Sequence, residues 1–491
     1  MRLLYIDIDS LRPDHMGCYG YHRNTTPHID QLAKESTRFT NIYISDAPCL
    51  PSRTALWSGR TGFHTGVVNH GGVASQPYIE GRNRGHQDVF SRTGWMQALA
   101  KTGMKTVTIS PFGQRHAAWH WYASFNEIYN TGKNGGERAD EIAPVALDWL
   151  ERNGQDENWF LHINLWDPHT PFRSPEDFGE PFADDPLPEW FTEEMWQRCW
   201  NGFGAHSAQE PNGLTGEEGF PTLPRHLNSI DSMDAVRKWV DNYDTGILYA
   251  DLWVGRIIDK LRDLGIYEDT IIVIGADHGE NIGELNIWGD HQTADEITCK
   301  VPLLIRWPGI SETERVDNAL HYHFDWAATA IELLGGTVPD NWDGQSFAEA
   351  FRTGEESGRD YVVTSQGTWS CQRGVRFDYQ GDDYICLRTY HDGYKDLDEV
   401  MLYNLTQDPH EETNLVDELP HVADKAMSLL AEWQQNQMFT SKYDVDPLMT
   451  VMREGGPFYT RGRLPQYIER LKATGRAAAA EKLAKRHPDE L

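Results

Sequence analysis

The sequence predicts an α/β fold, in which helices flank a large, doubly wound mixed sheet and a smaller antiparallel sheet with a helix follows near the C-terminus. Strand-like apolar runs alternate with helix-like segments over about residues 2–335. Several of these strands end in Asp or His, and open α/β sheets bind ligands at the carboxyl ends of their strands. From about residue 358, short alternating strands follow one another, which is typical of an antiparallel sheet.

The composition restricts the partners of the protein. Its 491 residues are enough for two domains, or for one large domain with additions. The formal net charge of −31 repels nucleic acid and anionic membranes, so we expect neither as a partner. Six cysteines without CxxC pairs argue against a disulfide framework and a zinc ribbon. No apolar run approaches transmembrane length, and the early charges at the N-terminus predict a cytoplasmic protein without a secretory signal.

The first strand is predicted at residues 2–9 and carries two acidic side chains. Side chains alternate along a strand, so Asp7 and Asp9 are expected on the same face near its carboxyl end. Two carboxylates in that arrangement repel each other unless a cation lies between them. The alternative interpretation is a capping Asp beside a solvated one.

A helix at 29–36 and a strand at 37–44 lead to the segment Cys49-Leu-Pro-Ser-Arg53. Pro51 suits the first turn of a helix, where N–H groups have no intrahelical partner, and Gly59 suits its C-terminal end. The free N–H groups and the dipole at such a start attract anions and would lower the pKa of a thiol. Cys49 is therefore a candidate reactive residue, and the alternative is a buried structural cysteine.

A helix is predicted at 92–102 and a buried strand at 105–110, followed by a loop that carries Arg115 and His116. The residues alone allow a cation and a histidine in a loop without a function.

The strand predicted at 159–166 runs into Asp167-Pro-His-Thr-Pro171. A histidine between two prolines is held in a stiff, extended loop, so His169 is a candidate site residue. His162 lies inside the strand and is predicted to be structural. Residues 173–235 are rich in Pro, Gly, Trp and acidic residues without a sustained period, which indicates a long insertion that covers the ligand edge as a lid.

An amphipathic helix at 236–264 precedes a β-branched run at 270–275, which is typical of a strand covered on both faces. That strand ends in Asp277 and His278. These residues bring hard oxygen and imidazole ligands to the same sheet edge as the two acids of the first strand. His291 follows a Gly-Asp pair and could donate a hydrogen bond or a proton, and the alternative is a surface histidine.

The C-terminal part of the chain is predicted to form smaller elements. The predicted organisation is a catalytic α/β domain at 1–350 with the insertion, a smaller α+β subdomain at 351–440, and a tail at 441–491. The elements expected there are a helix at 318–335, strands at 361–364, 374–377 and 384–388, a helix at 420–437, and a tail helix at 469–485.

The segment Cys49-Leu-Pro-Ser-Arg53, with a small residue and a glycine downstream, resembles the signature of type I sulfatases, a family of the alkaline phosphatase-like superfamily. In that family a formylglycine-generating enzyme oxidises the cysteine to formylglycine. Leu50 and Ser58 depart from the usual residues of the signature. The likeness extends over about residues 1–435, through the segments 10–20, 26–33, 299–309 and 401–415.

The resemblance implies a divalent metal site. Asp9 matches the first N-terminal ligand of the family, whereas Ser10 stands where the family has a second Asp, so Asp7 is the expected substitute. The implied ion is Ca²⁺, with Mg²⁺ or Mn²⁺ left open. The expected metal ligands are Asp7, Asp9, Cys49, Asp277 and His278.

The resemblance also implies catalytic roles. Arg53 would hold the hydrated formylglycine made from Cys49. His116 is the candidate for the family's active-site histidine and would act as a base, with Arg115 as its positive neighbour, although the Gly-Lys pair that the family has before this histidine is absent. His120 is the competing choice. His169 and His291 would contact the sulfate and protonate the leaving oxygen.

The function implied is that of a sulfuric ester hydrolase, a sulfatase. The signal-less start, the large lid and the Trp-rich composition favour a small sulfated sugar or oligosaccharide as its substrate, because aromatic faces stack on sugars. One alternative is a phosphonate monoester or phosphodiester hydrolase of the same superfamily, and another is a binding protein without catalysis. The sequence leaves the substrate and the oligomeric state open.

Overall fold

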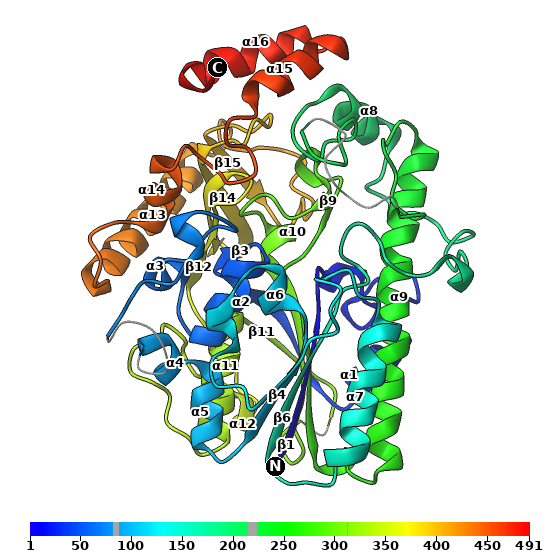
Figure 1. Cartoon of the computed structure of the whole chain (residues 1–491). Helices are drawn as coiled ribbons and strands as arrows, with labels where there is room; N and C mark the ends of the chain where they lie inside the picture. The colour runs from blue at the N-terminus through cyan, green and yellow to red at the C-terminus, as the bar shows by residue number, and fades with distance from the viewer. Residues whose placement is uncertain (82–87, 215–222, 312) are drawn as a thin grey trace.

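The structure, a computed structural model, describes residues 1–81, 88–214, 223–311 and 313–491 (Figure 1). Its main sheet has eight strands in the order β11-β2-β10-β7-β1-β6-β4-β5. Neighbouring strands are parallel, except that β10 is antiparallel to both β2 and β7, which confirms the predicted mixed sheet. The strands are β1 (Arg2–Ile8), β2 (Thr37–Tyr43), β4 (Lys105–Ile109), β5 (Glu127–Tyr129), β6 (Trp159–Leu165), β7 (Thr270–Gly275), β10 (Lys300–Arg306) and β11 (Arg315–Tyr322).

The central strand β1 sets the position of the functional edge. It pairs in parallel with β6 on one side and with β7 on the other. Asp7 lies opposite Asn164 of β6 and Gly275 of β7, so the three strands end at nearly the same level. The segments that follow these strands are therefore brought together at one edge of the sheet.

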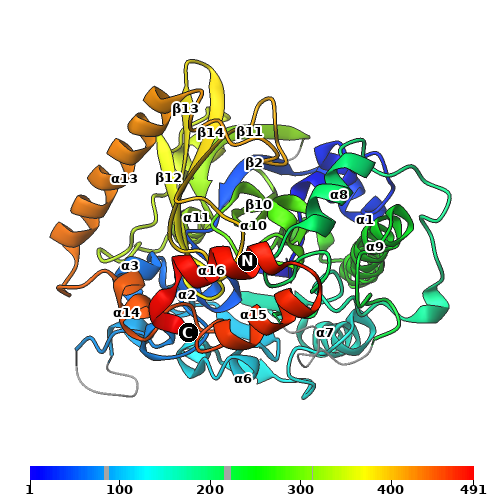
Figure 2. The same cartoon turned by 90° about the horizontal axis from the view of Figure 1, so that it is seen from above.

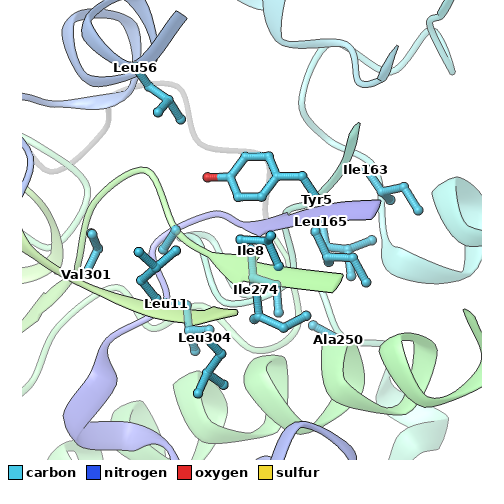
Figure 3. Packing of buried hydrophobic residues seen from close by; sticks show 14 of the residues in the cluster. Tyr5, Ile8, Leu11, Leu56, Ile163, Leu165, Ala250, Ile274, Val301 and Leu304 are labelled. Atoms are coloured by element: carbon cyan, nitrogen blue, oxygen red, sulfur yellow. The ribbon is translucent and has the colours of Figure 1, made fainter. Parts of the chain in front are cut away.

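Helices cover both faces of the sheet, as predicted. Figure 3 shows Leu56 of α2 on one side of the central strands and Ala250 of α9 on the other. The strand residues between them, such as Ile8 and Ile274, are fully buried. One face carries α1 (Pro27–Ala33), α7 (Ala139–Asn153) and α9 (Met233–Asp263), and the other carries α2 (Cys49–Ser58), α5 (Trp95–Lys101) and α11 (His323–Leu333) (Figure 1).

Three predicted helices differ from the structure. The start of 318–335, residues 318–322, belongs to strand β11, because this segment pairs with β2, and the helix α11 begins only at His323. The helix predicted at 92–102 is α4 (Val89–Thr93) followed by α5, with an extended Gly94 between them. The tail helix predicted at 469–485 is interrupted by Gly475, whose φ of 81° ends one helix before the next begins.

A second sheet has the order β15-β14-β13-β12-β3 and is antiparallel apart from β3, which confirms the predicted smaller sheet. Its edge strand β3 (Asp46–Ala47) lies just before Cys49 and pairs in parallel with β12. The smaller sheet is therefore attached directly to the segment that leads into α2. The other elements of this part are β12 (Tyr361–Gln366), β13 (Cys371–Tyr379), β14 (Asp382–His391), β15 (Val400–Asn404) and α13 (Pro420–Thr440).

The tail folds into the helices α14 (Pro447–Arg453), α15 (Leu464–Ala473) and α16 (Ala477–Arg486). In Figure 1, α15 and α16 lie over the upper end of the molecule, whereas α14 lies at the left near α13, and Figure 2 shows the tail from above. Apolar residues of α15 and α16 form a small core with Phe203 of the insertion and Tyr394. The remaining short elements are α3 (Gly62–Thr65), α6 (Phe112–Arg115), α8 (Glu193–Asn201), α10 (Glu296–Cys299), α12 (Ala348–Thr353), β8 (Asn281–Ile282) and β9 (Trp288–Asp290).

Two predictions concern the whole chain. All six cysteines carry free thiols, in agreement with the predicted lack of a disulfide framework. Among the described residues, none of the helices combines the length and the apolar composition needed to cross a bilayer. The cytoplasmic location stays a prediction.

Candidate active site

The site is centred on the first residue of α2. As predicted, this helix begins at Cys49, and it ends at Ser58 before Gly59, whose φ of 68° is the left-handed conformation of a helix C-cap. All of its side chains are buried, because it packs against α5 and α11. This packing fixes Cys49 in the interior, where it is only 1% exposed.

Two carboxylates reach this point from the ends of β1 and β7. Asp9 follows β1 directly, and Asp277 lies two residues beyond β7. Between them, Ser10 has a φ of 62°, and Tyr243 donates a hydrogen bond of 2.7 Å to its carbonyl. The hydroxyl of Ser10 donates to Asp9 at 3.2 Å, and its N–H donates to Asp277 at 3.4 Å. A left-handed residue other than glycine costs energy and is enriched at functional sites.

The side chains of Asp9, Cys49, Asp277 and His278 converge on one point. One ligand atom from each lies within 4.8 Å of all the others, and all four residues are buried. His278 Nε2 is 3.1 Å from Cys49 Sγ, 3.3 Å from Asp277 Oδ2 and 3.8 Å from Asp9 Oδ1. The structure thus brings together four of the five predicted metal ligands.

The hydrogen bonding of His278 fits a cation at this point. Its Nδ1 donates to the carbonyl of Gly279 at 2.8 Å, which assigns the lone pair to Nε2. Burial lowers the pKa of His278 well below its usual value, so the ring is neutral. The lone pair of Nε2 then faces the carboxylates of Asp9 and Asp277. All three groups accept hydrogen bonds and cannot donate to one another, so a hard divalent cation between them would stabilise the arrangement.

Arg53 supports the same conclusion by its charge. Its Nε and Nη2 donate to Asp7 Oδ2 at 3.0 and 2.8 Å, and its Nη1 donates to Asp9 Oδ2 at 3.0 Å and to Asp277. One guanidinium among three buried carboxylates leaves two negative charges. Burying charge without compensation is costly, so the donor set fits a divalent cation.

Asp7 lies outside the group of four. Its Oδ2 is engaged by Arg53 and lies 3.5 Å from His162 Nε2, and its Oδ1 has no hydrogen-bond partner among the described residues. In this geometry the carboxylate of Asp7 orients Arg53. The role of Asp7 as a metal ligand stays a prediction, and the hydroxyl of Ser10 is the other oxygen next to Asp9.

The expected lowering of the Cys49 pKa is wrong. Burial, followed by the charge of Asp9, raises the pKa of the Cys49 thiol to about 11, although the hydrogen bond with His291 opposes this. The local sequence shows only the helix start, which lowers the pKa of a thiol. The burial of Cys49 and its closeness to the Asp9 carboxylate, which both raise the pKa, arise only in the folded protein. An unmodified Cys49 would therefore be a thiol and a poor nucleophile.

Two predicted histidines lie beside the group of four. His291 Nε2 is 3.9 Å from Cys49 Sγ, and His291 Nδ1 is 3.0 Å from Glu280 Oε2. His169 donates from Nδ1 to the carbonyl of Thr170, and its Nε2 lies 4.0 Å from Asp9 Oδ1. The rings of His169 and His291 are 5.3 Å apart between centroids. Both side chains are thus available to a ligand bound at Cys49.

The structure also distinguishes between the two histidines after β4. His116 follows α6 and lines the cavity above Cys49, together with Arg115. Its ring is 4.7 Å from that of His70, and Cys49, His70 and His116 have ligand atoms within 4.8 Å of one another. His120 does not line this cavity. Its Nε2 is instead hydrogen-bonded to Thr54 Oγ1 at 3.0 Å.

A cavity of about 630 Å³ opens above Cys49. Its size is that of a pocket for a small molecule. The insertion predicted to form a lid does contribute to its wall, although residues 215–222 of it lie outside the described residues. The lining residues are Cys49, His70, Arg115, His116, Asn134, His169, Thr170, His206, Asn212, Gly213, Gly289, Asp290, His291, Trp369, Tyr459 and Arg463.

Several residues of the site were not predicted from the sequence. Glu280 could have been found, because it follows Asp277-His278-Gly279 at the same strand end. His70 lies in a glycine-rich loop after α3, and Trp369 and Tyr459 lie in the smaller sheet's connection and the tail. Nothing in their local sequence indicates a site.

Two family models match the chain. The Sulfatase model matches residues 2–336, and the model of the N-sulphoglucosamine sulphohydrolase C-terminal region matches residues 283–437. Iduronate 2-sulfatase of Mus musculus is 25% identical over 356 residues, which cover 63% of this chain and 60% of that protein. N-acetylglucosamine-6-O-sulfatase of Bacteroides thetaiotaomicron is 21% identical over 513 residues, which cover 92% of this chain and 89% of that protein. The chain thus spans about 60% of the length of the first of these relatives.

Solved structures share the fold. A complex described as containing its substrate D-glucosamine-2-N,6-O-disulfate has a TM-score of 0.71 and 19% identity, and it covers 91% of this chain and 99% of its own. Phosphonate monoester hydrolase of Agrobacterium radiobacter has a TM-score of 0.67 and 19% identity, and the match covers 89% of this chain and 96% of that one. At these identities the likeness shows the fold alone. The Sulfatase model, however, matches well over half of the sequence, and the chain belongs to the sulfatase family.

Proposed function

We propose that the protein is a sulfuric ester hydrolase that acts on a sulfated carbohydrate. The observation that carries the proposal is the convergence of Asp9, Asp277 and His278 on Cys49, at the floor of a cavity that also receives His169 and His291. Membership of the sulfatase family supports the reaction. The names of the relatives, which include iduronate and N-acetylglucosamine sulfatases, support a sugar as the substrate.

Two groups that the family implies fit the residues present. Asp9, Asp277, His278 and the oxidised side chain of Cys49 would hold a divalent cation, which we propose is Ca²⁺. When bound, the cation supplies electrophilic polarisation of a sulfate oxygen, and formylglycine supplies a hydroxyl nucleophile in place of the thiol. The raised pKa of the thiol supports the need for this oxidation. A formylglycine-generating enzyme is therefore a proposed partner.

His291 is suited to protonate the leaving oxygen. Burial opposes its charge, but Asp290 and then Cys49 and Glu280 hold the pKa of His291 well above its usual value. Glu280 Oε2 accepts a hydrogen bond of 3.0 Å from His291 Nδ1. The other ring nitrogen, Nε2, is then directed toward Cys49. A charged imidazole in this position can bind a sulfate oxygen and donate a proton when the ester bond breaks.

His116 is suited to accept a proton. Burial lowers its pKa well below the usual value, so the ring is neutral and its lone pair can accept a proton, although the same shift makes it a weaker base than a free imidazole. Its Nε2 is buried and has no hydrogen-bond partner among the described residues. His116 would therefore take a proton from the group bound at Cys49, while Arg53 holds that group and neutralises charge.

The charge in the cavity suits an anionic substrate. Arg115 donates only to the carbonyls of Asn134 and Gly135, at 3.4 and 3.3 Å, and no ion pair of Arg115 occurs in the described part of the chain. Its charge therefore stays available in a protein whose net charge is −31. His169 provides a further ring at the same floor.

The experiment is a steady-state assay of sulfate release from a panel of sulfated mono- and disaccharides. We expect turnover by the wild-type protein and a loss of at least about a thousandfold in Cys49→Ala, because the reacting group is removed. Circular dichroism serves as the control for the fold. Sulfate release by Cys49→Ala near the wild-type rate would refute the mechanism, and faster hydrolysis of a phosphodiester than of every sulfate ester would favour the superfamily alternative.

A further inference from the structure

The tail at residues 441–491 takes part in the cavity although neither family model includes it. The two models end at residues 336 and 437. Tyr459 and Arg463 of the tail nevertheless line the same cavity as Cys49. A segment outside the family region thus forms part of the wall of the site that the family region builds.

The tail is held in place by a cluster that we call the tail clamp, formed by His391, Asp392, His487 and Glu490. His487 lies between two carboxylates, with Nδ1 2.9 Å from Glu490 and Nε2 2.9 Å from Asp392. His391 Nε2 is 3.1 Å from the same oxygen of Glu490. These residues join the end of β14 to the last turn of the chain, so the tail is docked by partly buried, charged hydrogen bonds.

Tyr459 connects the tail to the start of α2. Its N–H donates to the carbonyl of Thr368 at 3.2 Å, and its hydroxyl is 3.3 Å from His70 Nδ1. His70 Nε2 accepts a hydrogen bond of 3.4 Å from the N–H of Leu50, the residue after Cys49. This bond assigns the proton of His70 to Nδ1, which donates to the hydroxyl oxygen of Tyr459. The hydroxyl proton of Tyr459 is then free to be donated to a ligand.

Tyr459 and Trp369 form an aromatic wall. Their ring centroids are 4.7 Å apart with an angle of 35° between the planes, and both residues line the cavity. Tyr459 is 37% exposed, so part of its surface is accessible from the cavity although its N–H and its hydroxyl are both hydrogen-bonded. The C–H face of a sugar ring can pack on such a surface, while its hydroxyls bond to the polar groups around it.

We propose that Tyr459, together with Trp369, binds the sugar ring of the substrate and gives the enzyme its preference for sugar sulfates over sulfates without a ring. The proposal rests on the proposed function, since it assigns the specificity of the same site. The floor around Cys49 takes the sulfate, and the aromatic wall takes the ring that carries it. The cavity of about 630 Å³ has room for a substrate of one or two rings.

The test compares a sugar sulfate with ethyl sulfate, which has a similar alcohol as its leaving group but no ring. We expect Tyr459→Ala to lower the ratio of kcat/KM for the sugar sulfate to that for ethyl sulfate by about tenfold, mainly through KM. Tyr459→Phe keeps the ring and should retain most of the preference. The control is Phe439→Ala, which removes an aromatic residue that is 86% exposed and does not line the cavity.

A ratio of kcat/KM values that does not change in Tyr459→Ala would overturn the proposal, whether both values are kept or both fall by the same factor, because a merely structural role would affect both substrates alike. Failure of the wild-type protein to hydrolyse any sulfate ester would instead refute the proposed function. In that case the binding of the same sugar sulfate to Cys49→Ala is measured by tryptophan fluorescence. If the Kd is the same in the double variant Cys49→Ala/Tyr459→Ala, the inference is overturned. A Kd about tenfold weaker in the double variant would support it.

Discussion

Replacing Asp277 by Asn should abolish the dependence of thermal stability on a divalent cation. In the wild-type protein, Arg53 provides one positive charge among the carboxylates of Asp7, Asp9 and Asp277. A divalent cation would balance the two remaining negative charges. Asp277→Asn keeps the size of the side chain but removes one charge and one strong oxygen ligand, so the site would have much less affinity for the cation.

The magnitude follows from the charges and from linkage. A carboxylate interacts with each unit charge of a cation about 4 Å away by about 4 kcal/mol at an effective dielectric constant near 20. Losing one carboxylate from a divalent site should therefore weaken the Kd by at least about a thousandfold. A cation present at about 100 times its Kd adds about 2.7 kcal/mol to the free energy of unfolding. That gain should disappear almost entirely in Asp277→Asn at the same cation concentration, because the weakened site would be largely empty.

The assay is thermal denaturation after chelation, with calcium chloride returned over several decades of concentration. We expect the Tm of the wild-type protein to rise with the logarithm of the calcium concentration and that of Asp277→Asn to stay level. The matched control is Glu268→Gln, which removes one acidic charge at an exposed side chain paired with Arg306 and should keep the wild-type slope. A wild-type Tm that does not respond to Ca²⁺, Mg²⁺ or Mn²⁺, or an equal slope in Asp277→Asn, would show that these residues do not hold a divalent cation.

Three further predictions follow from contacts around the site. His116→Ala should lower kcat by at least about tenfold, whereas His120→Ala should change it little; equal kcat values in the two variants would contradict the assignment. His487→Gln should destabilise the tail, and because the pKa of His487 is raised to about 9, the Tm difference from wild type should be full near pH 6 and shrink as pH rises through 9; a difference constant over that range would contradict it. Gly59→Ala should lower the Tm by several degrees, since a Cβ there would lie 2.1 Å from Trp342 at a φ of 68°; an unchanged Tm would disprove this strain.

The floor of the site could be predicted from the sequence because its signals are local. Asp9 and Asp277 each follow a strand whose apolar pattern is unambiguous, and parallel strands end at one edge. Cys49 stands at a helix start marked by the prolines around it. The register of β1 with its two neighbours then places these residues together, as the predicted fold requires.

The wall and the electrostatics could not be predicted, because they depend on distant residues. Tyr459 and His70 are separated by 389 positions and meet only through the docking of the tail. The pKa of Cys49 is set by burial and by Asp9, which outweigh the helix start that the local sequence shows. Residues 318–322, which were predicted as the start of a helix, form a strand because they pair with β2. The sequence of one segment does not show which distant strand will pair with it.

The mass of the peptide that contains Cys49, taken from protein that releases sulfate, shows directly whether Cys49 provides the reacting group as formylglycine. We expect a peptide about 18 Da lighter than the unmodified sequence, because oxidation exchanges the thiol for an aldehyde. If this peptide from active protein has the mass of unmodified cysteine, Cys49 does not react as formylglycine.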